Sequence, residues 1–421
     1  MDRRRFITGV AKAGFGAIAL GGVGKAFAGI AGLQVVEAQQ RVIDLTIGEA
    51  LVEMADKKQV YIWTFKDSRL PLSYPGPAII GREGELVSLK VTNTLKQPHE
   101  FKIQGTTITT GTIAAGKSVT IQFPMPQAGT YLYLDSLQAP INRVMGLHGA
   151  IVSLPVSGTT PYSIPTAVMQ ELFNDLGGPL FPGNAWDPNR WWIWLFGGID
   201  PVLHAAIQAG KTYTPAQFLA AAKPRYFTIN GKGGYFSAHD PQIAPSGMVG
   251  QPGLIRILNA GLASHSPHIH GNHVYMLRAT SAAGIEMPDN LRWVDTSRAA
   301  QATTLDWLLP FQLPPDIPER AGCWLPYQEL NTNLLVPANP MVYPMHCHCE
   351  MSQSANGGNY PAGLITHWNI TGDARPGGVG SFLPAQVAAL APKVESGAPL
   401  GINTLRPNRG THDGALTHSR R

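Results

Sequence analysis

The chain has 421 residues, of which 44% are hydrophobic and 14% are charged, so it is long enough for two domains and apolar enough to form buried cores. Its 46 Gly and 35 Pro favour turn-rich β structure and argue against a helical bundle. The formal net charge of +5 comes mainly from basic residues at positions 1–28, and the remainder is near neutral. No nucleic-acid partner is expected, because phosphate binding needs clustered Lys and Arg.

Residues 1–38 have the pattern of a twin-arginine signal peptide. Arg3 and Arg4 precede an apolar stretch rich in Gly and Ala, which ends at the small residues Ala26 and Ala28. A membrane anchor is the alternative, but this stretch is shorter than the roughly 20 residues that a spanning helix needs. Cleavage near residue 28 and cleavage near residue 38 both fit the sequence. We therefore expect a periplasmic or extracellular mature protein without a membrane span.

The three cysteines are too few for a disulfide framework in an exported chain of this length. A single bridge is compatible with the sequence, and Cys323 with Cys349 is the first pair to consider. Cys347 would then remain free for another role.

Residues 41–157 alternate apolar and polar residues in short segments separated by turns, a pattern typical of a β-sandwich. The expected strands are 60–65, 86–91, 101–103, 119–123, 130–134 and 150–154. Residues 225–372 return to the same pattern. The chain is thus expected to be all-β with two β-sandwich domains, followed by a loose tail at 373–421 with a short helix near 385–391.

Residues 158–224 differ from both β regions and are expected to form a partly helical linker. Helices broken by Pro are expected at 166–176, 199–209 and 215–222. The segment also holds an aromatic cluster, which consists of Trp186, Trp191, Trp192, Trp194 and Phe196. Such a cluster can dock a partner subunit, but it more often fills the crevice between two domains.

Two stretches of the second β domain concentrate the histidines. They are S-H-S-P-H-I-H-G-N-H at 264–273 and Y-P-M-H-C-H-C-E-M-S at 343–352. Side chains alternate faces along a strand, so the histidines of each His-x-His pair share one face. The pairs are His268 with His270 and His346 with His348. Two strands can therefore present four imidazoles together.

Cys347 and His265 are expected on the opposite faces of these strands, where a thiolate and an imidazole could meet. Sulfur with imidazole is the ligand set of blue copper, and all-imidazole sets suit copper or zinc. Individually satisfied core or surface histidines are the alternative. Two His-x-His pairs with an intervening cysteine favour a metal site.

The segments R-I-L-N-A-G-L-A-S-H-S-P-H-I-H-G-N-H-V-Y-M-L (256–277) and N-P-M-V-Y-P-M-H-C-H-C-E (339–350) resemble the copper-binding motifs of multicopper oxidases and laccases. Residues 45–157 resemble the family's N-terminal cupredoxin domain more weakly. The resemblance implies Greek-key cupredoxin folds in both domains and copper-dependent oxidation of a small reductant or metal ion, with oxygen as acceptor. It also implies a homotrimer, because two-domain members complete their sites between subunits. By position, the resemblance assigns type 1 copper to His265 and Cys347, and the trinuclear cluster to His268, His270, His346 and His348.

The first domain departs from the family pattern. The corresponding tripeptides are Lys102-Ile103-Gln104 and Leu134-Asp135-Ser136, and neither holds a histidine. His99 and His148 fall outside the motif, although His148 could approach a metal from its strand. The trinuclear cluster is therefore expected to be incomplete. Lys102, Asp135 and Arg143 could instead bind an anion or a substrate in that space.

The type 1 site also departs from the family, which places a second histidine where Ser352 stands. The segment 352–361 looks like an insertion before Leu364, which stands near the place of the axial residue. Spacing does not choose a substitute ligand, and loop or packing roles are the alternative for most of the candidates. The candidates are Cys349, Glu350, Met351 and His367. Four acids could carry protons near the metal or serve surface and capping roles, namely Asp135, Asp240, Asp295 and Glu329.

The favoured hypothesis is an exported copper oxidoreductase in which the four imidazoles hold metal and electrons enter through Cys347. The alternative is a non-catalytic copper-binding or electron-transfer protein derived from a multicopper oxidase. A nitrite-reductase-like enzyme ranks last, because its type 1 cysteine would be expected in the first domain, which has none.

Overall fold

The computed structural model describes residues 41–287, 291–314 and 341–378, together with the backbone of 326–328, 335–337 and 380–381. These residues belong to one compact unit. The predicted signal peptide at 1–38 and the helix predicted near 385–391 lie outside the described residues, as do Cys323 and Glu329.

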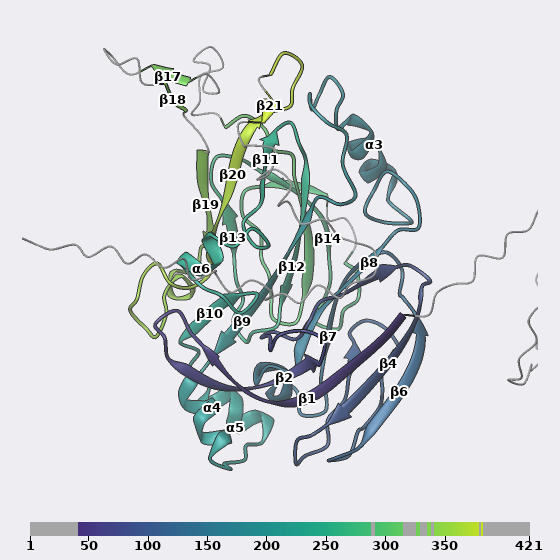
Figure 1. Cartoon of the computed structure of the whole chain (residues 1–421), viewed down its shortest axis with the longest axis vertical. Helices are drawn as coiled ribbons and strands as arrows, with labels where there is room; N and C mark the ends of the chain where they lie inside the picture. The colour runs from purple at the N-terminus through teal and green to yellow at the C-terminus, as the bar shows by residue number, and fades with distance from the viewer. Residues whose placement is uncertain are drawn as a thin grey trace, which may run out of the picture. The chain divides into compact units, whose positions relative to one another are not determined.

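The first part of the described chain forms a β-sandwich of two four-stranded sheets (Figure 1). One sheet has the order β2(Gln59–Asp67), β1(Arg41–Glu53), β4(Leu86–Asn93), β6(Ser118–Pro124). The other has the order β3(Ile79–Arg82), β8(His148–Leu154), β7(Gly129–Leu134), β5(Lys102–Ile103). The six expected strands are thus confirmed, whereas β1 and β3 were not among them.

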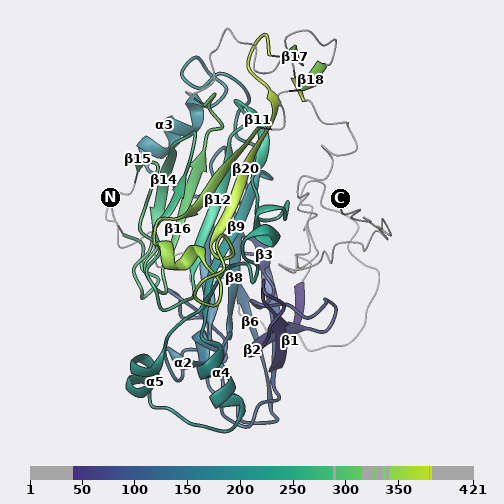
Figure 2. The same ribbon diagram turned by 90° about the vertical axis from the view of Figure 1, so that its left-hand side faces the viewer.

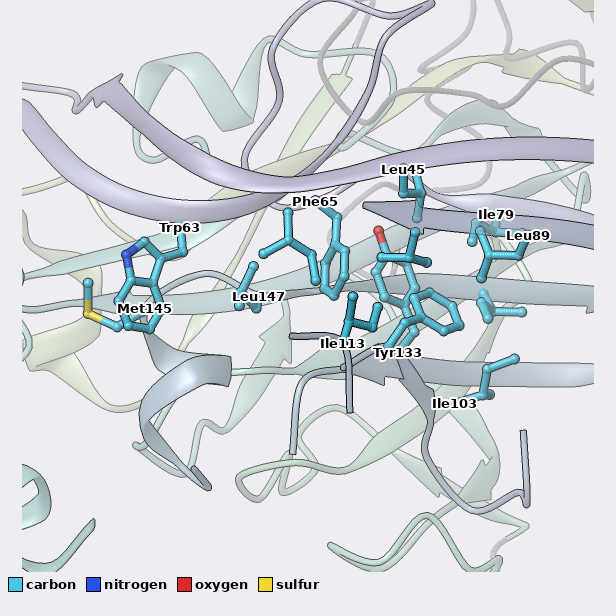
Figure 3. Packing of buried hydrophobic residues seen from close by; sticks show 14 of the residues in the cluster. Leu45, Trp63, Phe65, Ile79, Leu89, Ile103, Ile113, Tyr133, Met145 and Leu147 are labelled. Atoms are coloured by element: carbon cyan, nitrogen blue, oxygen red, sulfur yellow. The ribbon is translucent and has the colours of Figure 1, made fainter. Parts of the chain in front are cut away.

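Alternation of side chains explains how these strands form a sandwich. Along β4, Val87, Leu89 and Val91 are buried, while the residues between them are partly or fully exposed. Figure 3 shows that Leu89 of this sheet and Tyr133 of the facing sheet belong to one packed cluster. Because every second residue of β4 enters this core, a one-residue slip in register would expose its apolar side chains.

The second sandwich has a six-stranded and a five-stranded sheet. The first has the order β10(Tyr226–Ile229), β9(Trp191–Ile199), β12(Gly253–Asn259), β16(Thr304–Leu309), β14(Val274–Ala279), β15(Arg292–Val294). The second has the order β11(Ser246–Val249), β20(Ile365–Asp373), β19(Met341–Cys347), β13(Pro267–Ile269), with β21(Gly380–Ser381) paired to β20. A separate pair joins β17(Pro326–Gln328) to β18(Leu335–Pro337). All the metal-ligand candidates lie in or beside the second sandwich.

The prediction that residues 158–224 are only a linker is wrong at 191–199. This segment is β9, which pairs with β10 and β12 inside the six-stranded sheet. All nine residues are buried, since Trp194 and Phe196 enter the core of the second sandwich while Trp191 and Leu195 enter a different cluster. A strand covered on both faces has no alternation to reveal it, so its aromatic residues resembled a linker cluster.

The three expected helices are confirmed as α3(Ala167–Asp175), α4(Pro201–Gln208) and α5(Pro215–Ala221). The Asp200 carboxylate accepts the backbone N–H groups of Val202 and Leu203 at the start of α4. Thr214 and Gln217 form a capping box at α5. His204 of α4 donates from Nδ1 to the Tyr61 carbonyl of β2, which holds this helix against the first sandwich (Figure 2). The short helices are α2(Ile141–Val144) and α6(Tyr235–Ala238), with a 3-10 turn at Glu350–Gln353.

Among the described residues, no helix is long and apolar enough to cross a membrane.

The two sandwiches share an apolar cluster and a buried polar network. Leu132 and Val152 of the first sandwich pack in one cluster with Leu195 and Leu308 of the second, so the aromatic strand fills the space between domains, as expected for its aromatic cluster. The network joins Thr130 and Tyr162 to Asp306 at 2.7 Å each, and Arg256 donates to Thr130 Oγ1 at 2.8 Å. Both the apolar and the polar contacts therefore connect the domains.

Candidate metal centre

Strands β13 and β19 bring the two histidine stretches together. They pair antiparallel with His268 directly opposite His346, and Pro267 opposite Cys347. Directly opposed residues place their side chains on the same face of the sheet, so the imidazoles of both pairs converge on one side.

Three of the four predicted imidazoles have ring nitrogens within 4.8 Å of one another, namely His268, His270 and His346. The Nε2 atoms of His270 and His346 are 2.9 Å apart. His348 is outside this group, but its ring centroid lies 4.5 Å from that of His268. His270 and His348 are exposed, so the imidazole face is open at its surface.

Backbone and hydroxyl groups orient two of these rings. His268 Nδ1–H donates to the Asp295 carbonyl at 3.0 Å and lies 2.8 Å from Thr296 Oγ1, which leaves Nε2 as the free nitrogen. His346 Nδ1 is 3.2 Å from the Cys347 carbonyl. Desolvation and the neighbouring imidazoles lower the pKa of His268 and of His270. The rings therefore stay neutral to lower pH, and neutral imidazole is the metal-binding form.

The opposite, buried side of the strands holds Cys347 and His265. The Cys347 Sγ lies 3.5 Å from His265 Nδ1, and the backbone N–H groups of Ser266 and Cys349 donate to this sulfur at 3.2 and 3.4 Å. Burial lowers the pKa of His265 to about 4 and raises that of the Cys347 thiol. His265 Nε2 is buried without a hydrogen-bond partner among the described residues. The six predicted residues are thus placed as two adjoining sets, and their role as metal ligands stays a prediction.

The place of the second type 1 histidine is taken by Ser352, which is buried. Its hydroxyl donates to the Cys349 carbonyl at 2.7 Å. Leu364 is in the same buried cluster as Cys347 and accepts the Cys347 backbone N–H. A hydroxyl and an aliphatic side chain thus stand where the family places further ligands.

Among the described residues, none of the four candidate substitute ligands forms a side-chain hydrogen bond with the Cys347 sulfur. Met351 is 73% exposed and Glu350 is also exposed. His367 packs its ring against His239 instead. Cys349 is exposed, and its bridge to Cys323 stays a prediction because Cys323 lies outside the described residues. Its sulfur lies 3.6 Å from the Ser264 carbonyl.

The first sandwich repeats this arrangement with other residues. Strands β5 and β7 pair Lys102 with Leu134, as β13 and β19 pair His268 with His346. The backbone N–H of Asp135 donates to Leu147, as that of Cys347 donates to Leu364. The equivalent positions of the cluster face, Lys102, Gln104, Leu134 and Ser136, hold no imidazole.

A buried trio that was not predicted from the sequence lies at the first sandwich's counterpart of the type 1 site. His99 Nδ1 is 2.6 Å from Asp135 Oδ2, and Asn142 donates to the same oxygen at 2.9 Å. His99 precedes Lys102 by three residues, as His265 precedes His268, and this repeated spacing could have identified the trio. His148 does not join the imidazole group, since its Nδ1 donates to the Arg143 carbonyl at 2.7 Å.

The acids predicted as proton carriers differ in their positions. Asp295 is half exposed, and its Oδ2 lies 3.7 Å from His268 Nδ1. Asp240 pairs with Lys232 at 2.6 Å, and Asp135 belongs to the buried trio. Among the described acids predicted for this role, Asp295 alone contacts the imidazole group.

Comparisons with known proteins agree with this architecture. Residues 46–156 match the multicopper oxidase family. The chain is 27% identical over 207 residues to laccase-2 of Oryza sativa subsp. japonica, covering 45% of this chain and 32% of the relative. It is 30% identical over 95 residues to a copper-containing nitrite reductase of Pseudomonas chlororaphis, covering 20% of this chain and 26% of the relative. The chain thus spans about a third or less of these curated relatives.

The structure is similar to that of a blue copper oxidase from Nitrosomonas europaea, with a TM-score of 0.56 and 18% identity over 79% of this chain and 86% of the other. This similarity concerns the fold. The match to the multicopper oxidase family falls on the first sandwich, which lacks the histidine pairs. Residues 46–156 therefore match a multicopper oxidase domain, and the described chain has an all-β fold similar to that of a blue copper oxidase, which confirms the predicted resemblance and fold class; copper is the metal of this family.

Proposed function

We propose that the protein is a copper-dependent oxidoreductase that oxidises a small reductant or a metal ion and passes the electrons to oxygen. The observation that carries this proposal is the convergence of three imidazoles on one side of β13 and β19, with a thiol and an imidazole on the other side. Cys347 connects the two sets along the chain. Its side chain lies on the buried side, while its neighbours His346 and His348 lie on the imidazole side.

The orientation of these residues supports copper binding. His268 is held through Nδ1, so that Nε2 faces His270 and His346, and neutral imidazole nitrogens are suitable ligands for copper. Bound copper would supply one-electron redox chemistry. Asp295 is placed to hold a proton beside His268, and the hydrogen bonds from Ser266 and Cys349 favour the anionic form of Cys347.

The cluster of this chain is proposed to be smaller than a complete trinuclear site. Four imidazoles suit one or two ions, and the corresponding face of the first sandwich has Lys102, Gln104, Leu134 and Ser136. The same deficit favours a second candidate function, a copper-binding or electron-transfer protein that does not reduce oxygen.

Metal content and oxygen uptake test these two functions. The full chain is loaded with copper, freed of excess metal and analysed for copper per chain. Less than one copper per chain would contradict both functions. Oxygen consumption with phenolic, cuprous or manganous donors supports the oxidase, whereas bound copper without consumption supports the carrier.

Export by the twin-arginine pathway and assembly as a homotrimer are also proposed. Substitution of Arg3 and Arg4 by Lys is expected to retain the protein in the cytoplasm, as cell fractionation would measure. Sedimentation of the mature protein would give its subunit number. A monomer would contradict the trimer without affecting the metal site.

A further inference from the structure

A cavity of about 590 Å³ lies at the first sandwich's counterpart of the imidazole face. Its lining includes Lys102, Gln104, Leu134 and Ser136, and the strand register makes these residues equivalent to the four imidazoles of the second sandwich. The volume is within the roughly 300–1,000 Å³ of small-molecule sites. The repeat thus places a cavity where the second sandwich places its candidate ligands.

Arg143 is the buried cation of this cavity. It is 6% exposed, and the hydrogen bonds of its guanidinium to the described residues run from Nη1 to the carbonyls of Ala260 and Gly261, the latter at 2.8 Å. No carboxylate pairs with its guanidinium among the described residues. Burying a charge without a partner is costly, which favours a site that receives an anion. A guanidinium can hold a carboxylate through two parallel hydrogen bonds.

Lys102 is the second cation in the lining, and the structure gives its ammonium group no ion pair or hydrogen bond with the described residues. Asp135 also lines the cavity, but neither Asp135 nor Glu100 forms an ion pair with these cations among the described residues. The Asp135 carboxylate accepts from His99, Asn142 and the Leu137 backbone N–H. Glu100 lies outside the lining, and its carboxylate bonds to Ser136 and Thr109.

The rest of the lining is largely apolar, with contributions from Leu134, Ala139, Ala283 and Ile285. A bare inorganic ion would leave this surface against water. We propose that the cavity binds a small organic carboxylate, with its carboxylate group on Arg143 and Lys102 and its apolar body on the aliphatic side chains.

Titration of the full chain with 4-fluorobenzoate, followed by fluorine NMR, tests this assignment. The neutral amide 4-fluorobenzamide is the control ligand, because it has nearly the same shape without the charge. We expect saturable binding of 4-fluorobenzoate at millimolar concentration or below, and binding of the amide weaker by about tenfold or more. The measurement is made with and without bound copper(II), and both samples are expected to give the same affinity.

Lys102→Gln is the test variant, because Arg143 also holds backbone groups of the second sandwich and its loss could disturb folding. We expect this variant to bind 4-fluorobenzoate about tenfold more weakly. Lys117→Gln makes the same change in an exposed turn before β6 and is expected to bind like the unaltered chain.

Five outcomes would overturn the proposal, and the first four concern binding of the probe itself. They are the absence of saturable binding, equal binding of the amide, unchanged affinity in Lys102→Gln, and binding that requires copper(II). Complete displacement by an equal concentration of inorganic phosphate would also overturn it, because the apolar lining would then contribute nothing. None of these outcomes bears on the proposed redox function.

Discussion

Two cysteines, Cys347 and Cys349, are separated by one residue and have opposite environments in this protein. Cys347 is 2% exposed and lies 3.5 Å from His265 Nδ1, whereas Cys349 is exposed. The difference arises from strand geometry, since β19 ends at Cys347 and the chain then turns into Glu350–Gln353. Cys349 is therefore a matched control for substitution of Cys347 in the buried ligand set.

We expect the copper-loaded protein to show a thiolate-to-copper absorption band that disappears in Cys347→Ser. Cys349→Ser should keep the band, because its exposed sulfur points to the Ser264 carbonyl. Visible absorption and paramagnetic resonance spectra of the three proteins make the measurement. If the band were lost only in Cys349→Ser, Cys349 and not Cys347 would be the thiolate ligand, and the prediction would be wrong.

Removal of one imidazole is expected to weaken copper binding strongly. His268→Ala leaves two of the three converging nitrogens, so its copper affinity should fall by more than the roughly 10–100-fold that the loss of an outer-shell partner costs. Competition against a copper chelator gives the affinity. His239→Ala removes an exposed imidazole outside the group and should bind copper as before; equal losses in both variants would refute the site.

Strands differ in how readily a sequence reveals them, and β4 and β9 show the two extremes. Alternation in β4 predicts a half-buried strand, whereas β9 is buried throughout. The same alternation predicted that His268 and His270 share a face. It did not predict the trio of His99, Asp135 and Asn142, because their proximity depends on long-range pairing.

The environment of the residue at the second type 1 position could not be predicted from the sequence. Counting from Cys347 identifies Ser352 at this place, but no spacing rule shows that Ser352 is buried and donates to the Cys349 carbonyl. The contacts of a residue that replaces a ligand depend on the tertiary structure around it. The sequence alone therefore predicted the missing histidine but not the contacts that Ser352 makes in its place.

A single tryptophan in β9 is expected to contribute strongly to stability. Trp194 is 2% exposed, and its Nε1–H donates to the Ile243 carbonyl at 2.7 Å. Trp194→Ala should lower the free energy of unfolding by about 3–5 kcal/mol through cavity formation. Trp293→Ala, at a 41% exposed position, should cost less than about 1 kcal/mol. Denaturant titration distinguishes them, and similar losses would argue against a buried role for β9.

At the scale of the whole molecule, buried charge joins the two sandwiches. Arg256 is fully buried, and its nearest carboxylate is that of Asp306 at 3.7 Å. Asp306 also accepts from Thr130 and Tyr162, which belong to the other side of the contact. Its charge therefore serves both domains at once.

Asp306→Asn should destabilise the protein by about 3–5 kcal/mol, because Arg256 would be left as an uncompensated buried charge. Asp44→Asn makes the same change in an exposed pair with Lys90 and should cost less than about 1 kcal/mol. Urea unfolding of both variants gives the comparison. A loss for Asp306→Asn no larger than for Asp44→Asn would show that the network contributes little.

Two buried histidines away from the metal centre make stability depend on pH. Burial lowers the pKa of His148 and of His204 from 6.5 to about 4. The unfolded chain takes up these protons at higher pH than the folded chain, so stability is complete above pH 6.5 and falls as the pH drops toward about 4. The loss is about 2 kcal/mol per histidine at about pH 5.

Denaturant unfolding at several pH values measures this slope. His204→Asn keeps a side-chain N–H donor for the Tyr61 carbonyl but cannot titrate, so its slope should be shallower by about one third, because His148 and His265 still titrate. A slope equal to that of the unaltered protein would exclude His204 as a source of the dependence.

Since Leu132, Val152, Leu195 and Leu308 lie in one cluster, neither sandwich is a self-sufficient module. A fragment that contained only the first sandwich would expose an apolar surface of leucine and valine side chains and would self-associate. A fusion that transfers one sandwich to another protein must therefore also cover this apolar surface.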